Sequence, residues 1–174
     1  MARRTVAVVV LGLALLTGAV ACDGGRDDAA NCGTADLRWK ATRTSGNGRD
    51  APAAVLSATN KGARRCALDG YPELDAHVGK AQGTTAKPEP GKGDPDRVVL
   101  EPGRTADFAL FYDPYPSKGY CFMDGFLDPS LYVIPPRPAR GDYGTSTELT
   151  DAKGRQLPAQ ICGDDVRIGP ARLR

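Results

Sequence analysis

The chain has 174 residues, and 23 Lys and Arg against 21 Asp and Glu give a formal net charge of +2. Two of the basic residues, Arg3 and Arg4, lie within the first 21 residues, so residues 22–174 carry 21 basic and 21 acidic side chains. Nucleic-acid binding depends on neutralising phosphates, and a domain with balanced charge gives no reason to expect a nucleic-acid partner.

Residues 1–21 have the three parts of a secretory signal peptide. Arg3 and Arg4 form the positive segment, residues 6–16 the apolar segment, and Ala19-Val20-Ala21 the small-residue cleavage site. The apolar run is shorter than the roughly 20 residues of a transmembrane helix. We therefore expect the rest of the chain to be exported from the cytoplasm.

Cys22 follows the small residues directly, and this arrangement resembles the lipobox of bacterial lipoproteins. In that family the thiol receives a diacylglyceryl group, and the chain is cut just before it. The chain has five cysteines, so an unmodified Cys22 would be an unpaired thiol in an oxidising compartment. Two acyl chains hold a protein stably on a membrane. The alternative is ordinary cleavage of the Ala-x-Ala site, which would release a secreted soluble protein.

The residues after Cys22 divide into a tether and a β-rich domain. Residues 22–31 are polar and contain glycine, which predicts a lipidated flexible tether. The domain, residues 32–174, contains no convincing helical period, and residues 79–96 form a Gly-, Pro- and Lys-rich loop without periodicity. Alternating or short apolar runs separated by turn residues predict strands at 37–42, 53–59, 74–78, 98–100, 105–112, 131–134 and 166–168, with a hairpin around 151–154. This pattern predicts an all-β fold, an antiparallel immunoglobulin-like β-sandwich of about seven or eight strands.

Several segments together resemble a known family. They are Cys32-Gly-Thr-Ala-Asp-Leu37, Leu56-Ser-Ala-Thr-Asn60, Cys66-Ala-Leu-Asp-Gly-Tyr-Pro72, Val99-Leu-Glu-Pro-Gly103, Ala106-Asp-Phe-Ala-Leu110, Cys121, Val133-Ile-Pro135 and Cys162. The order is similar to that of a family of secreted actinobacterial lipoproteins known as a domain of unknown function. The preference for Arg over Lys and for Asp over Glu is also typical of a GC-rich actinobacterial genome. The family implies an extracytoplasmic β-sandwich without an established activity.

The four cysteines of the domain are typical of two disulfides, for which three connectivities exist. The first and last strands of a sandwich often lie side by side, and Cys32 and Cys162 each precede one of them. We therefore expect the pairs Cys32–Cys162 and Cys66–Cys121.

Aromatic residues concentrate in one part of the chain, with eight of the eleven between Phe108 and Tyr132. Two prolines stiffen the loop around Tyr115, which would hold this side chain outward at low entropic cost. We predict a binding surface for a sugar or peptide, although the same residues would also suit core packing around Cys121. The surface consists of Tyr115, Tyr120, Phe122 and Phe126.

Catalytic and metal sites find little support in the sequence. His77 is the single histidine, so a zinc site, a blue-copper site and a Ser-His-Asp triad all lack ligands or partners. The pairs Asp124/Asp128 and Asp164/Asp165 would suit a glycosidase or a calcium site, but both pairs lie in turn-like contexts that favour Asp anyway.

We therefore expect no cofactor and no metal, and not an enzyme. The sequence predicts a monomeric cell-surface lipoprotein that binds or scaffolds an envelope protein, peptide or glycan while a diacylglyceryl group on Cys22 anchors it to the outer face of the cell membrane. The alternatives are a cell-wall polymer hydrolase that uses an Asp pair, and a secreted soluble inhibitor or ligand carrier.

Overall fold

The computed structural model describes residues 29–46, 51–78, 84–115, 129–158 and 160–174. The predicted leader, Cys22, and the tether up to residue 28 lie outside these ranges. In the described part of the chain every regular element is a strand, and no helix is present that could cross a membrane. The strands are β1 Leu37–Arg43, β2 Ala54–Asn60, β3 Cys66–Leu68, β4 Glu73–Val78, β5 Thr84–Thr85, β6 Lys87–Pro88, β7 Val98–Leu100, β8 Thr105–Asp113, β9 Pro129–Ile134, β10 Thr145–Thr147, β11 Leu149–Thr150, β12 Cys162–Ile168 and β13 Arg172–Leu173.

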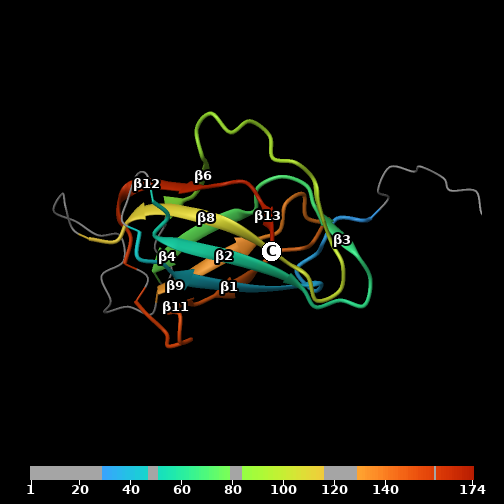
Figure 1. The fold of residues 1–174 in the computed structure, drawn as a ribbon, viewed down its shortest axis with the longest axis horizontal. Coiled ribbons are helices and arrows are strands. Elements are labelled where there is room, and N and C mark those ends of the chain that lie inside the picture. Colours follow the sequence, from blue (N-terminus) through green and yellow to red (C-terminus); the bar gives the residue numbers. More distant parts are fainter. Residues whose placement is uncertain (1–28, 47–50, 79–83, 116–128, 159) are drawn as a thin grey trace, which may run out of the picture.

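The strands form three sheets (Figure 1). The largest has the order β11-β1-β2-β8-β12-β6, with β13 also paired to β8. The second has the order β10-β9-β4-β5, and the third consists of β3 and β7. The all-β prediction is confirmed for the described residues.

Two details of the predicted sandwich are wrong. The large sheet is mixed, because β1 pairs in parallel with β11, and β12 pairs in parallel with β6. The described residues also contain thirteen strands, more than the seven or eight expected. The additional ones include β5, β6, β11 and β13, each of two residues. A two-residue strand is too short to show alternation, so its pairing depends on tertiary contacts rather than on a local sequence pattern.

The longer strands follow the predicted alternation. In β1 the side chains of Leu37, Trp39 and Ala41 are buried, whereas Arg38 and Lys40 are exposed. Strand β2 pairs antiparallel with β1 along its whole length and with β8 on its other side, so it is buried at the centre of the large sheet. The core is formed where the large sheet faces the second one, with Phe108 and Leu56 from the first and Leu74 and Val133 from the second.

The predicted disulfide pairing is wrong, because Cys32 is bonded to Cys66, with 4.9 Å between their Cα atoms. The chain before β1 runs beside β3, where the N–H of Cys32 donates to the carbonyl of Ala67 over 2.9 Å. Cys162 lies at the far end of β8, where it pairs with Asp113, and so cannot reach Cys32. Cys162 is itself disulfide-bonded. Cys121, the partner predicted for Cys66, lies outside the described residues.

The C-terminal residue is fixed to the outer face of the large sheet. The guanidinium of Arg174 binds both carboxylate oxygens of Asp107, with its Nη2 at 2.9 Å from Oδ1 and 2.7 Å from Oδ2. Ser57 on β2 donates to Asp107 Oδ1 over 2.7 Å, and the guanidinium of Arg104 donates to the carbonyl of Arg174 over 2.7 Å. These contacts hold β13 against the start of β8.

Replacing both Cys32 and Cys66 by Ala will lower the free energy of unfolding by about 4 kcal/mol, since the bond closes a loop of 34 residues. Urea denaturation of the oxidised wild type and of the double variant measures this difference. Equal stability of the two proteins would show that the bond does not constrain the unfolded chain.

Candidate functional site

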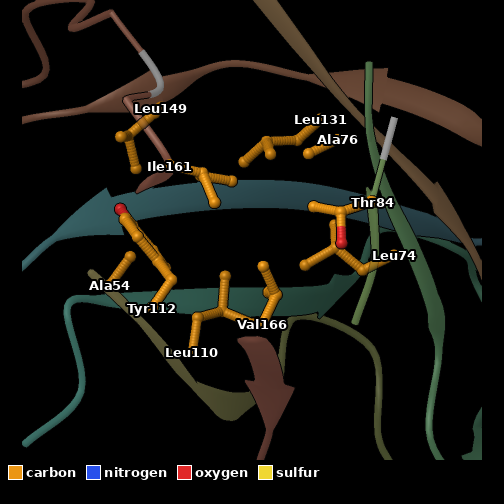
Figure 2. Close-up of a pocket in the computed structure, with 10 residues that line it drawn as sticks. All are labelled: Ala54, Leu74, Ala76, Thr84, Leu110, Tyr112, Leu131, Leu149, Ile161 and Val166. Carbon is orange, nitrogen blue, oxygen red and sulfur yellow. The ribbon is translucent and has the colours of Figure 1, made fainter. Parts of the chain in front are cut away.

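The cavity between the two larger sheets is too small to bind a ligand (Figure 2). It offers about 10 Å³ to the centre of a water-sized sphere, which is at the lower limit for one water molecule. Leu110 and Val166 from the large sheet and Leu74 and Leu131 from the second sheet line it. This space is a gap in a well-packed apolar core.

The hydroxyl group of Tyr112 is one of the few polar groups that line this cavity. Burial raises the pKa of Tyr112 to about 12, and the nearby charge of Arg43 lowers it only in part. The hydroxyl therefore stays protonated at neutral pH and cannot act as a base there.

An open groove of about 650 Å³ lies at the end of the domain where the chain leaves toward Cys22. One wall is the segment that enters β1, the other is the loop between β9 and β10, and Lys61 contributes a cation. We call this feature the entry groove. Its lining residues are Thr34, Ala35, Leu37, Lys61 and residues 139–145.

Asp142 ties the two walls of the entry groove together. Its Oδ2 accepts a hydrogen bond from the N–H of Thr34 over 2.7 Å, and its Oδ1 accepts one from the hydroxyl of Thr34. The N–H of Gly144 also donates to Oδ1, over 3.1 Å. Partial burial raises the pKa of Asp142, but the hydrogen bonds from Thr34 and Gly144 outweigh this effect and lower the pKa overall. The carboxylate therefore stabilises the loop at neutral pH, and this contribution is lost as the pH falls below the ordinary Asp range, near 3.8.

Tyr143 projects from the same loop with 78% of its surface exposed. Gly141 and Gly144 flank the Asp142-Tyr143 pair with φ angles of 86° and 82°, a conformation that side chains with a Cβ rarely adopt. A Cβ on Gly144 would also overlap the carbonyl oxygen of Val133. Tyr132 on β9 donates a hydrogen bond from its hydroxyl to the carbonyl of Tyr143. The backbone beneath the exposed ring is thus held on both sides.

The predicted aromatic surface can be examined only at Tyr115, because Tyr120, Phe122 and Phe126 lie outside the described residues. Tyr115 is 59% exposed, and the guanidinium of Arg43 lies 5.9 Å from the centre of its ring. It follows β8 directly, so it lies at the opposite end of the large sheet from the entry groove. Tyr115 and Tyr143 are therefore two separate candidate contact points.

The acidic pairs considered from the sequence are only partly described. Asp124 and Asp128 lie outside the described residues, as does the side chain of Asp164. Asp165 is 65% exposed and lies 3.6 Å from the Nε of Arg167. Among the described side chains, no group of three or more His, Cys, Asp or Glu is placed to hold a metal ion.

Residues 32–172 match the model of a family described as a domain of unknown function, DUF4232. The chain belongs to the DUF4232 family. No curated protein and no solved structure gives a significant match. The DUF4232 domain thus begins at Cys32 and includes the Cys32–Cys66 bond and the whole entry groove. The disulfide is itself a hint that the DUF4232 domain resides outside the cytoplasm.

Sequence reasoning missed Asp142 and Tyr143. Their segment, Gly141-Asp-Tyr-Gly144, lies between a Pro-rich stretch and a Thr- and Ser-containing strand and has no periodicity. The flanking glycines were a usable signal, because an aromatic residue between two turn glycines is seldom needed for the core.

Replacing Gly144 by Ala will displace the loop and lower the free energy of unfolding by about 2 kcal/mol, because Ala must adopt a positive φ angle beside the Val133 carbonyl. Thermal unfolding measures the change. Gly154, which also has a positive φ angle of 80° but no atom near its Cβ position, is the matched control and will lose less. Equal losses in the two variants would contradict the steric role of Gly144.

Proposed function

We propose that this protein is a lipoprotein of the outer face of the cell membrane whose DUF4232 domain binds a ligand without catalysing its conversion. Residues 1–21 serve as the export signal, and a diacylglyceryl group on Cys22 anchors the chain. The arginine-rich composition supports an actinobacterial origin. The domain is of the immunoglobulin-like sandwich type, a proposal supported by the two facing sheets with their shared core.

Cysteine parity supports the lipid anchor. Cys32 and Cys66 are bonded to each other, and Cys162 is also disulfide-bonded. Within this proposal the partner of Cys162 is Cys121, which leaves Cys22 as the one cysteine without a disulfide partner. A diacylated Cys22 removes the reactive thiol that an exported protein would otherwise expose.

The entry groove is the observation on which the binding function rests. Its exposed aromatic ring, Tyr143, lies beside the cations Lys61 and Arg140, and its loop is held by Asp142. A rigid, exposed aromatic ring gives a large contact area at low entropic cost, and the cations suit anionic groups. The ligand class that fits is an anionic glycan or peptide of the cell envelope.

The chemistry of the groove supports binding rather than hydrolysis. Asp142 is the one acidic side chain in its described lining, and both of its carboxylate oxygens accept hydrogen bonds from Thr34. Acid–base hydrolysis of a glycan needs two carboxyl groups on opposite sides of the scissile bond. A single carboxylate already used to hold a loop does not provide them.

Cys22→Ser will abolish incorporation of radiolabelled palmitate and release the protein into the medium or the soluble envelope fraction. The control is Cys32→Ala/Cys66→Ala, which keeps Cys22 and will remain labelled if it is exported. Unchanged labelling of Cys22→Ser would disprove the anchor, and absence of label from the wild type would favour the secreted soluble form.

Tyr143→Ala will reduce binding to purified cell-wall sacculi by about tenfold, which corresponds to about 1.4 kcal/mol. Co-sedimentation of the Cys22→Ser protein with and without this change measures the effect. Tyr115→Ala is the matched control, because it removes another largely exposed tyrosine ring at the other end of the large sheet and will change binding less than about twofold. A larger loss of binding in Tyr115→Ala than in Tyr143→Ala would place the ligand at the Tyr115 end. If the parent Cys22→Ser protein did not bind sacculi, the proposed ligand class would be refuted.

A further inference from the structure

The turn between β2 and β3, residues 61–65, carries Lys61, Arg64 and Arg65 and no acidic residue. All three side chains belong to exposed residues. We call this segment the basic turn. It stands out because residues 22–174 have balanced charge overall.

Asn60, which is fully buried at the end of β2, fixes the shape of the basic turn. Its side-chain N–H groups donate to the carbonyls of Arg64 over 2.8 Å and Leu100 over 2.9 Å. Its side-chain oxygen accepts from the N–H of Gly62 over 2.8 Å. The cations therefore project from a backbone that is already ordered, and binding through them does not require the turn to fold first.

The disulfide places the basic turn close to the point where the tether joins the domain. Arg65 precedes Cys66 directly, and the Cα of Cys66 lies 4.9 Å from that of Cys32, the first residue of the domain. Residues 22–31 span at most roughly 35 Å when fully extended. If Cys22 is acylated, as proposed above, Cys32 stays within that distance of the bilayer, and the turn is joined to Cys32 through Cys66.

Two carboxylates near the basic turn are held by hydrogen bonds within the domain. Asp36 accepts a hydrogen bond from the N–H of Gly33 over 3.0 Å, and Asp142 is held by Thr34. Glu101 and Arg104 share the adjacent turn and offset each other's charge. Hydrogen bonds hold these carboxylates without cancelling their charge, and the tether adds Asp23, Asp27 and Asp28 against Arg26. The three cations of the basic turn therefore act through close contact with an anionic surface rather than through a net positive charge at this end of the domain.

We propose that the basic turn docks on the anionic phospholipid headgroups of the membrane into which the tether leads. Lys and Arg side chains bind phosphate oxygens, and electrostatic attraction to an anionic bilayer acts within about 10 Å at moderate salt. The tether allows the turn to come within this range, and the fixed backbone presents its cations together. The contact orients the domain with its disulfide end toward the bilayer.

The experiment measures binding of the full mature chain carrying Cys22→Ser, and therefore lacking its lipid, to phosphatidylcholine vesicles with and without phosphatidylglycerol. We expect binding that requires phosphatidylglycerol and weakens between about 0.1 M and 0.5 M salt. Lys61→Ser/Arg64→Ser will weaken it about 25-fold, since each cation at an anionic surface contributes about fivefold. Both changes leave the backbone hydrogen bonds of the turn intact, and thermal unfolding verifies the fold.

Lys87→Ser/Lys153→Ser is the matched control, because it removes two exposed cations from other parts of the domain. Its vesicle binding will change less than about twofold, as will that of Tyr143→Ala. Absence of a phosphatidylglycerol requirement, or an equal loss in the lysine control, would overturn the proposal. So would binding to soluble polyphosphate but not to vesicles, which would identify a phosphate polymer as the partner.

Failure of the anchor would give a different result. Suppose that palmitate labelling shows no lipid on Cys22 in a protein that still binds only vesicles containing phosphatidylglycerol. That result would support the docking proposal and reject the proposed lipid anchor.

Discussion

The Cys32–Cys66 disulfide fixes the start of the domain against β3, at the point where the preceding chain enters. It joins the first residue of the DUF4232 domain to the first residue of β3, across a sequence separation of 34 residues. The hydrogen bonds between residues 30–32 and Ala67 make this junction a short stretch of parallel pairing as well as a covalent link. The end of the domain nearest the tether is therefore well ordered.

The entry groove and the basic turn both depend on this junction. Thr34, two residues after Cys32, holds Asp142 and hence the loop that carries Tyr143. The basic turn ends just before Cys66, and its Lys61 N–H donates to the carbonyl of Asp36 over 2.8 Å. A ligand in the groove and a membrane surface at the turn would thus be recognised by neighbouring parts of one rigid end, with Lys61 shared between them.

The sequence predicted the long strands well because their burial follows a local rule. Residues 37–43, 54–60 and 105–113 form strands close to the predicted ranges, and Leu37, Trp39 and Ala41 face the core as expected. The parallel pairing of β1 with β11 could not be predicted in this way. It brings together Ala41 and Leu149, and no local pattern in a two-residue strand specifies such a partner.

The cysteine pairing was predicted wrongly and the entry groove was missed for the same reason. Cys32 precedes β1 and Cys162 begins β12, and both strands belong to the large sheet. The two cysteines nevertheless lie near opposite ends of this sheet, and only the register of β2, β8 and β12 shows this. Asp142 acquires its role from Thr34, which lies 108 residues earlier in the chain. Features that depend on long-range register are set by the assembled fold, whereas strand positions and turn glycines are set locally.

The most direct test is disulfide mapping of the native protein without reduction. Trypsin places the four domain cysteines in different peptides, with Cys32 in residues 27–38 and Cys66 in residues 66–80. Mass spectrometry should find these two peptides linked to each other. A peptide of residues 27–38 linked instead to the one that contains Cys162 would contradict the account.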